Sequence, residues 1–312
     1  GFQEPVVLRF ANFRMVGSRW RRYTDNLRDG GLIADPEPGA DNFIVNVVNL
    51  EENAYADPAD PNKSPYVIPP GVVRDRDNTS SVPRQLNEQS VQVCIDELRD
   101  GDARAIYKNA AVDLFNYGRI KMFFHANSES NDDDLHAFLR LGTDFDQNFY
   151  EIEIPLKITP PGTDASDVRG IWPLENEIDL DLNELFALKV ARDREGFPLT
   201  EFYPRTGPKL VEERHLIRIF GRPDLSSVQV MMIGVRNPKT DDKRSHSICI
   251  WANELRVTDF DRTPGWAVSS TLSAKLADFA TVTGAYRHTT FGFGGVSSKI
   301  FERTRDETTA YD

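Results

Sequence analysis

The chain has 312 residues, 49 of them acidic and 37 basic, which gives a formal net charge of −12. Its size allows one large domain or two smaller ones, and with no apolar run of about 18 residues it does not fit a helical membrane protein. An acidic surface repels phosphate groups, so nucleic acid and anionic membrane surfaces are excluded as default partners.

At the N-terminal end, residues 6–16 and 43–50 are predicted as strands because both are rich in β-branched and aromatic residues. The basic cluster Arg19-Trp20-Arg21-Arg22-Tyr23 could contact nucleic acid, but against the acidic bulk charge we interpret it as a strand end with solvated arginines. Residues 54–83 contain six prolines, which indicates a long irregular connection. We therefore assign residues 1–83 to an N-terminal region of strands and Pro-rich loops.

The central region, residues 84–262, contains a dense series of short apolar runs separated by Gly, Asp, Asn and Pro. Many short strands with turn residues between them, and no alternating long helices, predict an antiparallel β-sandwich. The predicted strands are residues 89–95, 103–114, 119–126, 135–141, 149–158, 215–220, 228–235 and 247–257. In residues 175–182, acids alternate with apolar residues, as on the solvent face of a half-buried strand.

One helix is predicted within the sandwich. Asp181 and Glu184 have the spacing of a capping box, and Gly196 follows as a stop signal. Apolar and long side chains at helical spacing give the segment one buried face: Leu182, Leu185, Phe186, Lys189 and Val190. We expect an amphipathic helix that covers one end of the sandwich.

The tail, residues 263–312, has a different pattern. In residues 266–277, Trp266, Val268, Leu272 and Leu276 lie on one face, while small polar residues dominate the other face. Such alternation over about ten positions, opened by a tryptophan, is typical of an outer-membrane β-barrel strand, and residues 279–288 look like its returning partner. Two or three strands do not close a barrel. We therefore expect the remaining strands, like any leader peptide, to lie in sequence outside this chain.

The only two cysteines, Cys94 and Cys249, each lie inside a β-like apolar run. With no C-x-x-C and no Cys/His cluster, a structural zinc site is not expected. We interpret both as small buried hydrophobic residues. A bridge between them in an oxidising compartment stays open, because the sequence does not place their Cα atoms.

Motifs for nucleotide and metal chemistry are absent from the sequence. There is no Gly-rich phosphate loop, H-E-x-x-H is missing, and the five histidines never pair at helical or strand spacing. The Gly-rich stretch at residues 291–295 is interpreted as a turn between tail strands. Glu129 with Asp132-Asp133-Asp134 could bind Ca²⁺ through carboxylate oxygens, but without the EF-hand register we interpret these acids as a solvated loop.

Two further functions remain as alternatives. Glu151 and Glu153 share one face of a predicted strand, at a spacing near that of a retaining glycosidase pair. Trp172, Trp251 and Trp266 could stack on sugar rings, although aromatic residues in sandwiches are mostly packing residues. A surface carbohydrate-binding module is therefore the first alternative, and a glycosidase the second. Function has to be argued from an assembled site, and we assign no catalytic, cofactor-binding or metal-binding residue and expect no cofactor.

An ordered series of motifs covers nearly the whole chain and resembles the SprA/Sov family of Bacteroidota gliding motility and type IX secretion. The central motifs are residues 87–90 (NEQS), 101–105 (GDARA), 121–126 (KMFFHA), 141–144 (LGTD), 150–157 (YEIEIPLK), 171–177 (IWPLENE), 232–238 (MIGVRNP) and 250–257 (IWANELRV). Residues 17–21 (GSRWR), 48–53 (VNLEEN), 69–72 (PPGV) and 275–279 (KLADF) look like the same family. The ordered set is more specific than any single motif.

The resemblance implies a non-enzymatic structural segment of a very large outer-membrane β-barrel, through which folded cargo passes to the cell surface. It implies partner subunits, namely a PorV-type lateral protein and a periplasmic plug, as well as the secreted cargo proteins. Residues 123–126, 141–144 and 251–256 also look like a galactose-binding-like jelly roll. The expected fold is thus a jelly-roll β-sandwich with one short helix, followed by the first strands of an outer-membrane barrel.

Overall fold

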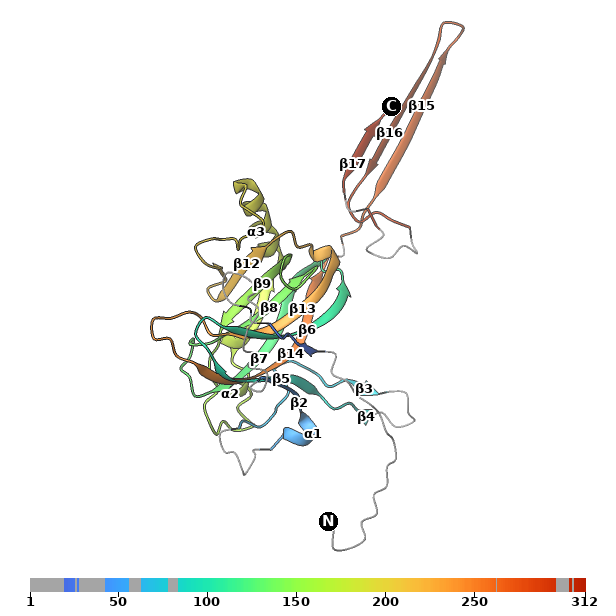
Figure 1. The fold of residues 1–312 in the computed structure, drawn as a ribbon. Helices are drawn as coiled ribbons and strands as arrows, with labels where there is room; N and C mark the ends of the chain where they lie inside the picture. Colours follow the sequence, from blue (N-terminus) through green and yellow to red (C-terminus); the bar gives the residue numbers. More distant parts are fainter. Residues whose placement is uncertain are drawn as a thin grey trace, which may run out of the picture.

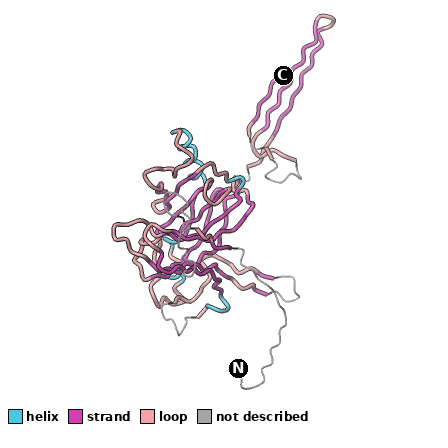
Figure 2. The backbone as a smooth tube through the Cα atoms, viewed as in Figure 1, coloured by secondary structure: helices cyan, strands magenta, loops and turns pink. Residues whose placement is uncertain are grey.

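The fold is described from a computed structural model, which covers residues 20–25, 27, 43–55, 63–77, 84–261, 263–295, 303–304 and 306–312. The predicted strand at residues 6–16 lies outside this part of the chain. Antiparallel strands dominate the fold, as Figures 1 and 2 show, and helices are few and mostly short. No helix in the described ranges is both long and apolar enough to cross a membrane.

Two large sheets form the body of the molecule (Figure 1). The seven-stranded sheet has the order β1-β6-β13-β8-β9-β12-β11, with β1 Arg21–Arg22, β6 Ala103–Val112, β13 Val228–Arg236, β8 His136–Gly142, β9 Phe149–Pro155, β12 His215–Phe220 and β11 Lys209–Val211. The five-stranded sheet has the order β10-β7-β14-β5-β2, with β10 Glu177–Asp181, β7 Tyr117–Ser128, β14 His246–Phe260, β5 Gln89–Leu98 and β2 Phe43–Asn49. Every strand predicted between residues 43 and 257 is present.

One apolar core joins the inner faces of the two sheets. It contains Leu139 and Ile152 from the seven-stranded sheet and Phe124 and Ile250 from the five-stranded sheet, all at most 1% exposed. Because side chains alternate along a strand, every second residue of each central strand contributes to this core. Burial of this apolar surface is the main force that holds the two sheets together.

Short elements that the sequence pattern did not predict complete the body. They include the edge strand β11, the small hairpin of β3 (Arg76–Asp77) with β4 (Arg84–Gln85), the helices α1 (Leu50–Asn53) and α2 (Val168–Ile171), and the 3-10 turns Leu174–Asn176 and Leu225–Ser227. These segments have only two to four residues each, too few for a periodic pattern to be visible.

The predicted helix is α3, Leu182–Glu195, and its ends follow the predicted signals. The Asp181 carboxylate accepts a hydrogen bond from the Asn183 N–H, and Gly196 ends the helix with a left-handed φ of 63°. The buried face differs from the prediction, since Val190 is 55% exposed whereas Leu188 and Arg192 are buried. On the buried side, the Arg192 guanidinium donates to the Gly221 carbonyl and is only 1% exposed.

The last three strands form a separate open sheet that extends away from the body (Figure 1). It consists of β15 Ala267–Leu276, β16 Ala280–Thr289 and β17 Thr308–Tyr311, in that order. The tail hairpin predicted from residues 266–277 and 279–288 is therefore present. At its base, the Phe291 ring lies 6.1 Å from Phe115, which in turn lies 5.8 Å from Phe186 of α3. This aromatic contact connects the projecting sheet to the helix end of the body.

Candidate functional site: the projecting sheet and the buried polar clusters

The two carboxylates of the glycosidase alternative lie on the outer face of the seven-stranded sheet, where they are buried. Tyr150, Ile152 and Ile154 of β9 point into the shared core, so the alternate residues Glu151 and Glu153 point away from it. Glu151 is nevertheless 0% exposed and Glu153 only 4% exposed. The outer face of this sheet is thus covered, which the alternating pattern alone did not predict.

Three arginines surround Glu151. Its Oε2 accepts from Arg140 Nε at 2.9 Å, and its Oε1 accepts from Arg218 Nε at 2.7 Å and from Arg236 Nη2 at 2.9 Å. Arg236 also donates to Glu153 at 3.1 Å, and His136 Nδ1 lies 2.5 Å from the other Glu153 oxygen. Aromatic rings cover the guanidiniums, with Arg140 3.8 Å from the Phe149 ring centre and Arg218 4.2 Å from that of Phe202. We call this set the Arg–Glu network.

The network's electrostatics favour a structural role for both carboxylates. Burial acts to raise the pKa of Glu151, but the Arg218, Arg140 and Arg236 charges outweigh it and hold that pKa well below its usual value. The pKa of Glu153 is lowered by the hydrogen bond from His136 and by Arg236, again against burial. A glycosidase acid requires a raised pKa and access to a sugar. The pKa values of both carboxylates are lowered instead, and at most 4% of either residue is exposed, so their geometry does not support the glycosidase alternative.

The tryptophans of the carbohydrate alternative are not assembled into a platform. Trp172 is 0% exposed and Trp251 is 2% exposed, and both pack with Tyr66 and Phe123 on the outer face of the five-stranded sheet. His125 stacks on Trp251 with ring centres 3.9 Å apart, and its Nδ1 lies 2.8 Å from the Ile171 carbonyl oxygen. Only Trp266, 55% exposed, is accessible, and it belongs to the projecting sheet. The packing interpretation of Trp172 and Trp251 is therefore confirmed.

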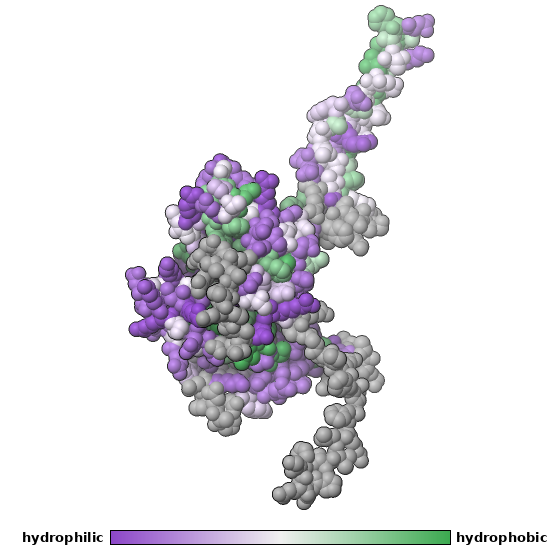
Figure 3. Space-filling view, viewed as in Figure 1, coloured by the Kyte–Doolittle hydropathy of each residue, from purple (hydrophilic) through white to green (hydrophobic). Residues whose placement is uncertain are grey.

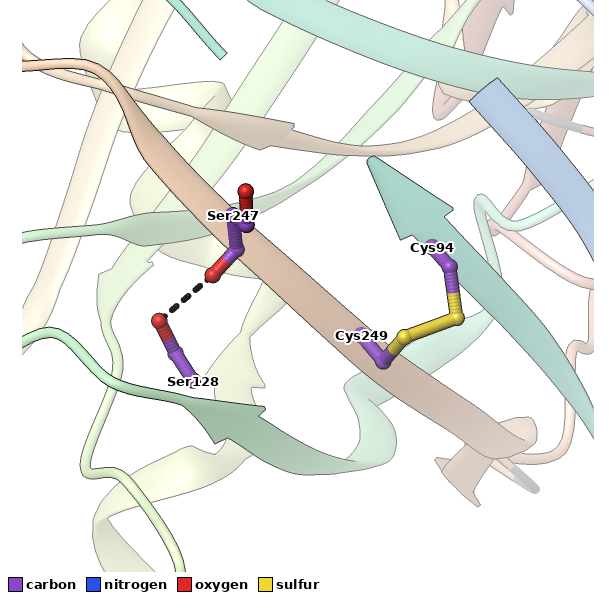
Figure 4. Close-up of a disulfide and its surroundings, with 4 residues drawn as sticks. All are labelled: Cys94, Ser128, Ser247 and Cys249. Carbon is purple, nitrogen blue, oxygen red and sulfur yellow. Dashed lines mark hydrogen bonds between the residues drawn. A yellow bond between two sulfur atoms is a disulfide. The ribbon is translucent and has the colours of Figure 1, made fainter. Parts of the chain in front are cut away.

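Cys94 and Cys249 form a disulfide across a sequence separation of 155. They lie directly opposite each other on the paired strands β5 and β14, so the bridge joins two interior strands of the five-stranded sheet (Figure 4). In the same view the Ser128 hydroxyl donates to the Ser247 carbonyl at 2.7 Å and joins β7 to β14. The bridge that the sequence left open is therefore present, and the interpretation of both cysteines as small buried hydrophobic residues is wrong, since both are half-buried. The strand register, which brings them together, is not visible in sequence.

The remaining candidates are dispersed. Asp134 accepts from the Asn131 N–H within its own loop, and Asp132 accepts from the Ile158 N–H and so joins this loop to the segment after β9. Within the described residues, no group of three or more His, Cys, Asp and Glu side chains is placed to hold a metal ion. Arg21 and Arg22 form the short strand β1, with both side chains exposed, as expected for a strand end. The Arg22 guanidinium donates to the Phe43 carbonyl.

The projecting sheet exposes large apolar side chains. Its register places Val268 opposite His288, Leu272 opposite Gly284, Leu276 opposite Ala280, and Tyr286 opposite Tyr311. Opposite residues in an antiparallel pair point to the same face, so one face carries the apolar residues, with Leu272 69% and Leu276 51% exposed. The other face carries Ser, Thr, Lys275 and Arg287. Figure 3 shows hydrophobic and hydrophilic side chains along this sheet. We call these two surfaces its apolar face and its polar face.

Comparison with known proteins identifies the family. The family model SprA_N, described as motility related/secretion protein, matches residues 1–312. No curated protein matches the chain. The family match confirms the resemblance found in the ordered motifs, and this family is not an enzyme family. The chain therefore belongs to the SprA_N family of motility-related and secretion proteins.

Proposed function

We propose that this chain is a structural segment of the outer-membrane translocon of type IX secretion, which exports proteins to the cell surface and serves gliding motility. In this proposal the strands β15–β17 belong to the wall of an outer-membrane β-barrel. The body is a soluble part of the translocon that these wall strands carry. The observation that carries the proposal is the exposed apolar face of the projecting sheet.

The dimensions of the projecting sheet support the proposal. β15 and β16 have ten residues each, so they are about 33 Å long at about 3.3 Å per residue. Transmembrane β-strands have about 9–11 residues and a tilt of about 45°. Trp266 precedes β15 and Phe279 follows it, so an aromatic residue lies near each end of the strand. Aromatic girdles flank the apolar band of membrane barrels in the same way.

The strand order of the body supports a galactose-binding-like jelly roll as its fold. Jelly rolls have eight strands in two sheets, linked as two Greek keys. Eight central strands of the body divide into the orders β5-β14-β7-β10 and β6-β13-β8-β9. We number these eight strands from first to eighth in chain order. The first sheet then has the order first, eighth, third, sixth, and the second sheet has the order second, seventh, fourth, fifth. This is the strand order of a jelly roll, to which β1, β2, β11 and β12 add edges.

The side chains on the outer faces of the two sheets favour a structural role for the body over a catalytic one. The Arg–Glu network and the Tyr66–Trp172–Trp251 cluster cover the outer faces of its two sheets with buried, packed side chains. A body of this kind is suited to present surfaces to other subunits. We propose a PorV-type lateral protein, a periplasmic plug and the secreted cargo as its partners, at the outer membrane and cell surface.

Cysteine labelling in the full-length protein tests the proposal. Both native cysteines are in the disulfide, so an added cysteine is the only free thiol of these 312 residues. Single substitutions Val268→Cys, Leu272→Cys and Ala274→Cys sample the apolar face, and Ser269→Cys, Thr271→Cys and Ser273→Cys sample the polar face of the same strand. In intact outer membranes, we expect a lipid-soluble maleimide to label the first set and a charged, water-soluble maleimide to label the second.

Each apolar-face variant has a polar-face variant one residue away on β15, so the two sets differ in the face that is labelled and not in the depth along the strand. Labelling of both sets by the water-soluble reagent would show that the sheet lies in water and would overturn the wall assignment. If neither reagent labelled the apolar face, protein would cover this face, and the wall assignment would be overturned as well. Secretion of a cargo protein by each variant verifies that the labelled molecules are assembled.

A further inference from the structure

A cavity of about 490 Å³ opens beside the five-stranded sheet, away from the projecting sheet and the Arg–Glu network. Three segments line it: residues 71–75, residues 86–89 at the start of β5, and residues 253–256 of β14. This volume lies within the range of small-molecule sites in proteins, about 300–1,000 Å³. None of the functional assignments made above uses this cavity.

Buried side chains hold the inner wall of the cavity in place. The Tyr66 hydroxyl, from a fully buried side chain, donates to Glu88 and lies 2.8 Å from the Ser90 hydroxyl. Asn253 Nδ2 donates to Glu88 Oε1 at 2.5 Å, and the Glu254 N–H donates to Asn253 Oδ1 at 2.8 Å. Glu88 and Asn253 are therefore oriented from behind by other groups, as in sites whose polar groups are positioned before a ligand binds.

The outer wall of the cavity supplies further donors and acceptors. A register shift in β14 follows Asn253, and Glu254 there has a left-handed φ of 54°. Bulges of this kind re-aim side chains at a sheet surface. Arg256 follows, with Nη1 3.8 Å from Glu254, and its Nε is buried without a hydrogen-bond partner in the described part of the chain. The Gln89 side chain is exposed and adds an amide group.

The composition of the lining selects a chemical class of ligand. Three carboxylates (Asp75, Glu88 and Glu254) face one guanidinium, which disfavours phosphate and other anions. The apolar lining is limited to Val72, Val73 and Leu86, too little for an acyl chain. A simple cation needs only acceptors, whereas the amides of Gln89 and Asn87 and the Arg256 guanidinium are donors. Hydroxyl groups both donate and accept, so a lining that mixes donors and acceptors fits a polyol best.

We infer that this cavity is a binding site for the hydroxyl-rich rings of a glycan. Glu88 and Glu254 accept hydrogen bonds from sugar hydroxyls, and Gln89 and Arg256 donate to them. Val72 and Leu86 contact the C–H surface of the ring. The site is independent of the proposed place of β15–β17 in a membrane wall. It also differs from the tryptophan platform considered from sequence, because it contains none of the tryptophans.

The test is glycan binding by the full-length protein, purified in a detergent without a sugar head group. The probe is a printed array of bacterial and mammalian oligosaccharides that also carries a pentalysine peptide. Bound glycans are then titrated against wild-type protein and the variants Gln89→Ala and Arg256→Ala. Gln147→Ala, an exposed amide in the turn before β9 and outside the cavity lining, is the matched control. We expect about a tenfold loss of affinity in each cavity variant, as for one lost hydrogen bond, and none in the control.

Unchanged thermal unfolding of each variant shows that the loss is local. Absence of any bound glycan would overturn the inference, as would glycan binding that Gln89→Ala and Arg256→Ala leave unchanged. Binding of pentalysine alone, weakened by Glu88→Gln, would replace the inference with a site for a basic peptide. Conversely, a glycan that binds the wild type and also shields Arg256 from a guanidinium-modifying reagent would place the ligand in the cavity.

Discussion

The body and the projecting sheet use the same local pattern, strands with alternating apolar and polar residues, yet their apolar faces meet different surroundings. In the body, Leu139 and Ile152 are 0% exposed because a second sheet covers them. In the projecting sheet, Leu272 and Leu276 have the same strand geometry but are 69% and 51% exposed. Alternation therefore specifies a two-faced strand, while the partner of each face depends on what the rest of the structure supplies.

The comparison also applies to the faces that alternation predicts to be polar. In the projecting sheet this face carries Ser, Thr, Lys and Arg, as expected of polar residues in contact with water. In the body, the outer face of the seven-stranded sheet carries charged residues that are buried under aromatic rings. The stability of the body thus depends on interactions that have no counterpart in the projecting sheet. Four predictions test this difference.

The largest effect is expected from removal of the disulfide. A Cys94→Ala/Cys249→Ala double variant opens a loop of 155 positions, and loop-closure entropy predicts a loss of about 5 kcal/mol in the free energy of unfolding. Denaturant unfolding of wild type and variant measures this loss. The fluorescence of buried Trp251 reports on the body, so its transition should move to lower denaturant. A transition at the same midpoint would show that the bridge contributes little to the folded body.

Removal of the central carboxylate of the Arg–Glu network should cost nearly as much. Glu151→Gln removes the carboxylate charge that Arg140, Arg218 and Arg236 share, and a broken buried ion pair typically costs about 3–5 kcal/mol. The matched control is Glu213→Gln, at an exposed position of the turn before β12, which should change stability by less than about 0.5 kcal/mol. Equal midpoints for both variants in denaturant unfolding would contradict the structural role of Glu151.

Acid should destabilise the body through His125. Burial lowers the pKa of this imidazole from 6.5 to about 4, against the hydrogen bond with the Ile171 carbonyl. Between these values the unfolded chain binds the proton and the folded chain does not, so stability falls as the pH drops from about 6.5 to about 4. The shift corresponds to about 3 kcal/mol.

His125→Asn isolates this contribution. The variant is expected to be less stable at pH 7 but to lose less stability than wild type between pH 7 and pH 4.5, measured by denaturant unfolding at each pH. His288→Gln, in the projecting sheet, is the control and should retain the wild-type pH dependence of the body. Parallel pH profiles for wild type and His125→Asn would exclude the buried imidazole as the acid-sensitive group.

The smallest effect on stability is expected at the exposed side of α3, in comparison with its buried side. Val190→Ala should change the free energy of unfolding by less than about 0.5 kcal/mol, because Val190 is 55% exposed. Leu185→Ala, at a buried position of the same helix, should cost about 3 kcal/mol. Thermal unfolding of the two variants gives the comparison. A large loss at Val190 would mean that this side of the helix is covered in the assembled protein.

Much of the fold could be predicted from particular residues. β-branched and aromatic runs marked β2, β5 to β9 and β12 to β14, and Asp181 and Gly196 marked the ends of α3. The ordered motifs led to the family that the comparison confirmed. The cavity near Glu88 could not be predicted, because its three segments are separated by up to about 180 positions in sequence and meet only after β5 pairs with β14.

The sequence by itself determined which segments are strands, which of their faces are apolar and to which family the chain belongs. These properties depend on residue type and on a period of two, which are local. Only the tertiary structure decided that Cys94 faces Cys249, that Glu151 is enclosed by three arginines and that Trp172 and Trp251 are buried. Each of these results depends on strand register and on which segments cover a sheet, and both are set by contacts between residues far apart in the chain.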